Sequence, residues 1–205
     1  MAVLIKDFMS YFRAPVSPYY DGGVYHAASL EPSAKISLER VAEAVAGNAK
    51  LKKLTEAVRA APNARTAKAH LLPYVTPMGV FKRRNARSII SSSGLAVLDF
   101  DKAGQDLDLE AAKRRIFDTF PQWVRLAFTS PGGRGLKLFI DLGGDITTMD
   151  PAKWGEMFHH LNMYIAQEYE GRFVLDEAGK DFCRACFLCH DPDVLYRPPQ
   201  DGLAR

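Results

Sequence analysis

Cysteine is scarce in this sequence of 205 residues, and where it occurs it is clustered. The three cysteines, Cys183, Cys186 and Cys189, share one short segment, which excludes a disulfide framework. No apolar run approaches the ~20 residues of a membrane span. The N-terminus, MAVLIKDFMSYF, lacks the apolar core and the small-residue cleavage site of a signal peptide. We therefore expect a cytoplasmic protein without a membrane segment.

Several catalytic signatures are also missing, among them the Walker A motif, the dinucleotide-binding fingerprint and the nucleophile elbow. Neither sign of charge is in strong excess, because 27 lysines and arginines face 24 acidic residues and leave a net charge of +3. That balance does not by itself indicate a nucleic-acid partner, so local clusters must carry the evidence. The length is sufficient for a hydrophobic core without disulfides or a structural metal.

The order of apolar patterns predicts an α+β fold with a largely antiparallel sheet. Two helices are expected after Ser37, the first ending at Gly47 and the second at Pro62. Strands and helices then alternate. Strands are expected at 71–75, 89–90, 94–101, 123–129, 136–142, 173–175 and 182–188, after a weak one at 2–6, and helices at 109–120 and from Pro151 to Gly171. The loop SPGGRG is too short for a parallel crossover, so it predicts a hairpin. We expect one domain over 1–205, with a helical lead-in over about 1–70, a core over about 71–197 and a tail or linker over 198–205.

The strongest strand ends in two acids, Asp99 and Asp101, separated by Phe100. Because side chains alternate along a strand, both carboxylates point to one face. Like charges this close repel each other, so something must compensate them. A hard divalent cation such as Mg²⁺ would do so. The alternative is an ordinary strand end with both acids in solvent.

The glycine-rich loop after residue 129 is the second candidate element. Its glycines permit positive φ, so that successive N–H groups can converge on an anion. Nearby positive charge and a hydroxyl group are typical of phosphate binding. The candidate phosphate ligands are Ser130, Gly132, Gly133, Arg134, Gly135 and Lys137. The alternative is a hairpin turn that is rich in glycine for steric reasons alone.

A third acid follows another apolar run, at Asp176. It could be a further metal ligand, and Asp181 and Arg184 could order the site around it. Arg184 is also a candidate nucleotide-binding residue. Asp181 is itself an alternative third acid. These residues could also form a simple surface turn with an Asp–Arg pair.

Two basic segments stand out. Lys82, Arg83, Arg84 and Arg87 could bind DNA phosphates, which supply most sequence-independent affinity, or they could form a solvated loop. The second helix carries Lys50, Lys52, Lys53 and Arg59, which we interpret as a solvent-exposed face. The cysteines do not favour a structural zinc, because no distant cysteine completes a ligand set and free cysteine is usually buried.

These elements in this order resemble the archaeo-eukaryotic primase superfamily, and more closely its VirE N-terminal-like branch. The resemblance rests on LLPYVTPMGVFKRRNARSIISSSGLAVLDFD (71–101), FTSPGGRGLKLFI (128–140) and DEAGKDFCRACFLCHDPDVLY (176–196), and ISLERVAEAV (36–45) also fits. It covers most of the chain. It implies a primase–polymerase-like fold, in which an RRM-like antiparallel sheet is flanked by helices.

The resemblance also implies a mechanism. Asp99, Asp101 and Asp176 would hold two ions, Mg²⁺ or Mn²⁺, and the loop with Lys137 would bind the triphosphate of an NTP or dNTP. With the three acids, Lys137 would make up the catalytic residues. The product would grow on single-stranded DNA, as template or primer, during replication of a mobile element or phage. Relatives often carry a helicase downstream, which makes a helicase a further expected partner. Family members have histidine where this chain has Lys137, so a catalytically inactive module that binds DNA or nucleotide is the alternative, and a metal-dependent phosphohydrolase is another.

Overall fold

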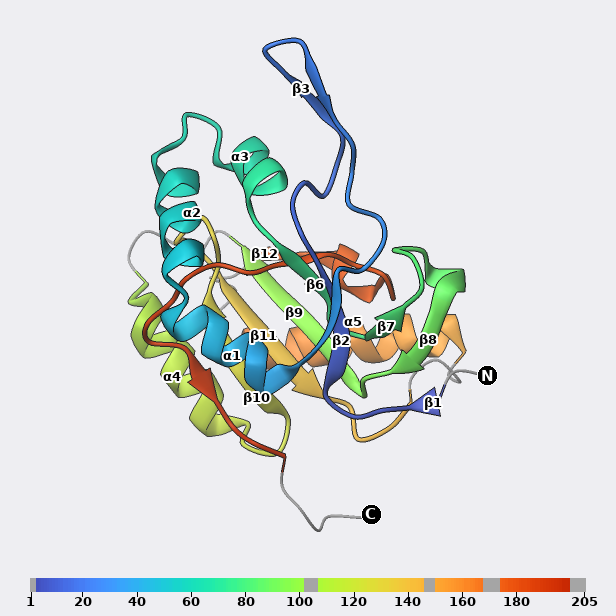
Figure 1. The fold of residues 1–205 in the computed structure, drawn as a ribbon. Helices are drawn as coiled ribbons and strands as arrows, with labels where there is room; N and C mark the ends of the chain where they lie inside the picture. Colours follow the sequence, from blue (N-terminus) through green and yellow to red (C-terminus); the bar gives the residue numbers. More distant parts are fainter. Residues whose placement is uncertain (1–2, 102–106, 146–149, 168–173, 200–205) are drawn as a thin grey trace.

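The computed structural model describes residues 3–101, 107–145, 150–167 and 174–199 (Figure 1). Its central element is a five-stranded antiparallel sheet with the order β12-β9-β11-β10-β14. The strands are β9 (Leu95–Asp101), β10 (Val124–Thr129), β11 (Leu136–Asp141), β12 (Val174–Leu175) and β14 (Leu195–Tyr196). Helices α4 (Leu109–Thr119) and α5 (Pro151–Gln167) connect them. The succession β9-α4-β10-β11-α5-β12 is the β-α-β-β-α-β arrangement of ferredoxin-like units.

The two faces of this sheet pack against different layers. Because side chains alternate, Ala96, Leu98 and Phe100 point to one face and share a hydrophobic cluster with α4 and α5. Leu95 and Val97 point to the other face and belong to a second cluster. That cluster includes residues of α1 (Leu38–Gly47) and α2 (Ala49–Ala60). The central sheet is therefore buried on both sides.

A second antiparallel sheet helps to cover the face opposite α4 and α5. Its order is β13-β6-β2-β5, from β2 (Phe8–Phe12), β5 (Ala34–Ser37), β6 (Tyr74–Thr76) and β13 (Cys186–Phe187). Met9, Val75 and Cys186 of this sheet lie in the same cluster as Val97 and Phe139 of the central sheet. The candidate acids at the end of β9 thus lie beside an interface between two sheets.

Smaller elements complete the described chain. A three-stranded sheet has the order β1-β8-β7, in which β1 (Val3–Leu4) runs parallel to β8 (Ile89–Ser92) and β7 (Gly79–Phe81) is antiparallel to β8. A hairpin of β3 (Tyr19–Asp21) and β4 (Val24–His26) stands away from the body in Figure 1. Helix α3 (Ala64–Leu71) and the short helical turns η1 (Ala86–Ser88) and η3 (Glu177–Lys180) are the remaining elements. In the described ranges, no helix is long and apolar enough to cross a membrane.

The structure confirms the α+β class, the antiparallel sheet and the hairpin around SPGGRG. The first 70 residues are not only helical, however, because the strands β1 to β5 also come from this region. Helix α3 was not expected, and it ends at Leu71, where a strand was expected. The strand expected at 182–188 is only Cys186–Phe187, because Asp181 engages the backbone of Cys183 and Arg184 in a local turn. The expected stop at Gly171 and residues 200–205 of the expected tail lie outside the described residues.

Candidate functional site

Three of the predicted site residues form one row across the central sheet. Lys137 of β11 lies directly opposite Asp99 of β9. On the other side, the Asp176 N–H donates to the Asp99 carbonyl oxygen over 3.0 Å, which extends the pairing of β12 with β9. Residues opposite each other on antiparallel strands point to the same face. Asp101 shares this face because it lies two residues beyond Asp99.

Lys137 and Asp99 form a largely buried ion pair. The Lys137 ammonium binds Asp99 Oδ2, and the two side chains are 5% and 19% exposed. Burial lowers the pKa of Lys137, but the Asp99 carboxylate outweighs it, and the net result is a raised pKa. Lys137 is therefore a fixed cation at neutral pH. The other carboxylate oxygen, Asp99 Oδ1, is buried without a hydrogen-bond partner in the described structure.

Asp176 is held by a second cation on the C-terminal segment. Arg184 Nη2 lies 2.5 Å from Asp176 Oδ2 in a partly exposed pair. Asp181 orders this segment, because its carbonyl oxygen accepts from the Arg184 N–H and its Oδ1 accepts from the Cys183 N–H. Trp154 of α5 donates its indole N–H to the Lys180 carbonyl oxygen over 2.9 Å and so fixes the preceding turn. The structure thus brings Asp176, Asp181 and Arg184 together, with Asp176 next to Asp99.

The predicted carboxylates do not form the tightest acidic group in the described chain. That group is Glu110, Asp191 and Asp193, whose ligand atoms all lie within 4.8 Å of one another and could hold a metal ion. The buried Lys113 ammonium already lies 2.7 Å from Glu110 Oε2 and 2.7 Å from Asp191 Oδ2. Sequence reasoning missed this group, because Glu110 and Asp191 are far apart in the chain.

The glycine-rich loop differs from the expected anion-binding nest. The Ser130 N–H donates to the Gly135 carbonyl oxygen and the Gly133 N–H donates to the Ser130 carbonyl oxygen, so both donors are already used. Of the loop glycines, only Gly133 has positive φ, at 72°. Gly135 has another role, since a Cβ at this position would overlap the Phe100 carbonyl oxygen. The missing side chain lets the loop lie directly against β9, beside Asp101.

Arg59 is exposed on α2, as expected, and it also contacts this loop. Its Nε donates to the Pro131 carbonyl oxygen over 3.2 Å. The contact joins residues 72 positions apart, so no local pattern could have revealed it. Arg59 and Arg134 are both exposed at the loop, and Lys137 lies buried beneath it. Two exposed arginines thus lie at the loop that packs against β9 beside Asp101, an arrangement suited to binding a phosphate chain.

The basic run divides into one structural and three surface residues. Arg84 is half-buried, with its Nη2 donating to the Val16 carbonyl oxygen over 3.0 Å and its guanidinium 5.4 Å above the Tyr74 ring. Lys82, Arg83 and Arg87 are exposed. Of the four residues expected to contact DNA, these three are accessible to phosphates.

The cysteines lie close to the row but pack as apolar side chains. Cys186 and Cys189 are buried, and Cys189 Sγ donates to the Thr129 carbonyl oxygen. Burial raises the pKa of Cys186 to about 11 and that of Cys189 to about 12, against the lowering effect of Lys137. Metal coordination needs the thiolate form, which these environments disfavour.

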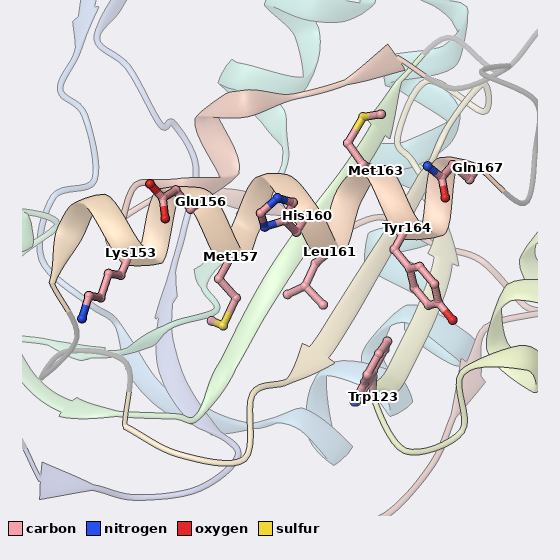
Figure 2. A pocket seen from close by; sticks show the side chains of 9 residues that line it. All are labelled: Trp123, Lys153, Glu156, Met157, His160, Leu161, Met163, Tyr164 and Gln167. Carbon is pink, nitrogen blue, oxygen red and sulfur yellow. The ribbon is translucent and has the colours of Figure 1, made fainter.

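A hollow of about 640 Å³ lies elsewhere, along α5 (Figure 2). Met157, Leu161 and Tyr164 project from the helix toward the side where Trp123 lies, and the Tyr164 and Trp123 rings meet edge-on at 6.0 Å. No predicted site residue lines this hollow. Because α5 packs on the face of the sheet opposite Asp99, the hollow and the row of carboxylates are separate.

Comparison with known proteins supports the resemblance at the family level. Residues 66–196, more than half of the chain, match the family described as BT4734-like, N-terminal domain. This family is related to VirE N-terminal and primase–polymerase-like domains. No match to a curated protein or to a solved structure was found. The chain belongs to the BT4734-like N-terminal domain family.

Proposed function

We propose that this domain transfers a nucleotidyl group from an NTP or dNTP to a DNA 3′-hydroxyl, with Mg²⁺ or Mn²⁺, in the replication of a mobile element or phage. One observation carries the proposal: Lys137, Asp99 and Asp176 share a row on three neighbouring chain segments, and Asp101 lies on the same face. Family membership is consistent with it, because the related domains are primase–polymerase-like.

The residues present fit divalent ions in their chemistry. Asp99, Asp101 and Asp176 offer hard oxygen ligands, and Asp99 Oδ1 is buried without a partner in the described structure. Bound ions would neutralise the triphosphate and activate the attacking hydroxyl. Arg59 and Arg134 would hold the phosphates, and Ser130 and Gly135 would keep the loop against β9. Positioning and charge neutralisation are the main contributions of a protein to phosphoryl transfer.

A second candidate is a module that binds nucleotide or DNA without catalysis. The ion pairs Lys137–Asp99 and Arg184–Asp176 favour it, because they neutralise two carboxylates within the protein itself. Such pairs compete with a metal for the same oxygens. Lysine also cannot act as a near-neutral acid–base group, as the family histidine could.

Incorporation of labelled nucleotides on single-stranded DNA tests the proposal, with Mg²⁺ or Mn²⁺ and with or without a primer. We expect product from the wild type and none from the Asp99→Ala/Asp101→Ala variant. Asp118→Ala is the matched control, because Asp118 is an exposed aspartate on α4, away from the row. It should retain wild-type activity.

Other outcomes point elsewhere. Metal-dependent nucleotide binding by the wild type without product would contradict catalysis and support the binding module. Release of phosphate or cutting of the strand without incorporation would indicate a phosphohydrolase. Wild-type activity in the double variant would remove the metal role of Asp99 and Asp101.

A further inference from the structure

The β3–β4 hairpin has an inner face that is fixed to the protein. Tyr19 pairs with His26 across the hairpin, and its ring stacks on that of His26 at 4.6 Å. The same tyrosine ring stacks on His70 of α3 at 3.7 Å. The hairpin is therefore anchored through Tyr19 while it projects from the body (Figure 1).

The outer face of this hairpin carries an exposed aromatic pair. Tyr20 and Tyr25 lie directly opposite each other, with ring centroids 5.2 Å apart. Because strand side chains alternate, they point away from Tyr19 and α3. They are 73% and 57% exposed. A cross-strand aromatic pair stabilises a hairpin, and rings this exposed are in addition accessible for stacking with a ligand.

The base of the hairpin contacts the basic run. Arg84 donates its backbone N–H to the Leu30 carbonyl oxygen over 2.8 Å, and its side chain donates to Val16, on the other flank of the hairpin. The exposed Lys82, Arg83 and Arg87 are therefore near the place where the hairpin leaves the body. Residues 82–87 contain no acid. Aromatic rings for stacking beside cations for phosphates are the combination by which proteins bind single strands.

We propose that the β3–β4 hairpin binds single-stranded DNA, with bases stacked on Tyr20 and Tyr25 and phosphates bound by Lys82, Arg83 and Arg87. The inference rests on the proposed function, since it names the surface that holds the template or primer of that reaction. The positive charge at the base of the hairpin favours a nucleic acid over a protein strand as the occupant.

Fluorescence anisotropy tests this inference, with a labelled oligothymidylate and without nucleoside triphosphate or divalent ion. The oligonucleotide has about 20 nucleotides, which is longer than most single-strand binding sites. Stacking contributes about 1–3 kcal/mol per base, so we expect Tyr20→Leu/Tyr25→Leu to raise the Kd at least about fivefold. Tyr20→Phe/Tyr25→Phe keeps the rings and should bind like the wild type. Tyr164→Leu is the matched control, because Tyr164 is a 55% exposed tyrosine on α5. It should not change the Kd.

Wild-type affinity in the leucine variant would overturn the inference and would leave a protein partner as the occupant of the tyrosine pair. Equal loss in the phenylalanine variant would also count against stacking. A second measurement needs no variant: ultraviolet cross-linking of a bromodeoxyuridine oligonucleotide should label the peptide that contains Tyr20 and Tyr25. The Asp101→Ala variant, which keeps the buried Lys137–Asp99 pair, separates this inference from the proposed function, since it should lose incorporation but keep the wild-type Kd for the oligonucleotide.

Discussion

Asp99 meets a cation on one strand and an acid on the other. The sequence indicated that the negative charges of Asp99 and Asp101, at the end of β9, must be compensated, and it identified Lys137 and Asp176 as site residues. It did not show that Lys137 itself compensates Asp99, because that contact depends on the register of β11 against β9. Register is fixed by the whole hydrophobic pattern and the hairpin geometry, not by the residues of one motif.

Lys137→Met should destabilise the fold by about 3–5 kcal/mol, because it leaves the partly buried Asp99 carboxylate without its cation. The double variant Asp99→Asn/Lys137→Met removes both charges and should lose clearly less stability. Urea unfolding of the single and double variants measures this coupling. Additive losses would show that the two side chains do not stabilise each other.

The thiols are predicted to differ in reactivity. Burial raises the pKa of all three thiols, to about 11 for Cys186 and about 12 for Cys189, but Cys183 is half-exposed and therefore accessible to a reagent. At pH 8 we expect a thiol reagent such as Ellman's reagent to label one cysteine of the native protein and all three after unfolding. Cys183→Ser should abolish the native reaction.

The burial of Cys186 and Cys189 should also make stability depend on pH. Because the pKa values of these two thiols are higher in the folded than in the unfolded protein, the free energy of unfolding should fall as the pH rises above about 9.

At the scale of elements, the loop between β10 and β11 depends on one glycine more than on the others. Gly135→Ala would press a Cβ onto the Phe100 carbonyl oxygen, so the loop must move away from β9. Gly132 has open space around it and no positive φ, which makes Gly132→Ala the matched control. We expect Gly135→Ala to lower stability by more than about 1 kcal/mol and to weaken nucleotide binding, with little change for Gly132→Ala. Thermal unfolding and nucleotide titration would measure both effects, and similar behaviour of the two variants would contradict this role.

Some helices and strands could be predicted from the sequence, and others could not. Strong local patterns identified β9, the β10–β11 hairpin and helices α1, α2, α4 and α5. The strands Phe8–Phe12 and Ala34–Ser37 were missed, because they are stabilised by a sheet whose other members come from residues 74–76 and 186–187. Short strands of this kind have little periodicity of their own, and tertiary pairing decides them.

At the scale of the whole molecule, the C-terminal segment closes the structure through Asp191. Its carboxylate accepts from the Lys113 ammonium and the Thr129 N–H, which links α4 and β10. Burial raises the pKa of Asp191, but these hydrogen bonds outweigh it and the net pKa is lowered. Stability from Asp191 is therefore present above its unfolded pKa, near 4, and is lost as the pH falls through its lower folded pKa. Asp191→Asn should be less stable at pH 7 and should show a flatter acid limb in unfolding experiments, whereas an unchanged acid limb would contradict this role.

Two clusters of exposed lysines and arginines differ in their place in the fold, and the one at residues 82–87 lies at the base of the β3–β4 hairpin. Replacing Lys82, Arg83 and Arg87 with alanine removes three charges beside the hairpin, while replacing Lys50, Lys52 and Lys53 removes three exposed charges from α2. Both variants have the same net charge, so long-range attraction to DNA falls equally. Direct phosphate contacts also release counterions, and three lost contacts should reduce the slope of log Kd against log salt by about 2. We expect this reduction for the 82/83/87 variant alone, measured by anisotropy between low and physiological salt. An equal reduction in both variants would show that DNA responds to the overall field of the protein and not to a binding surface at the base of the hairpin.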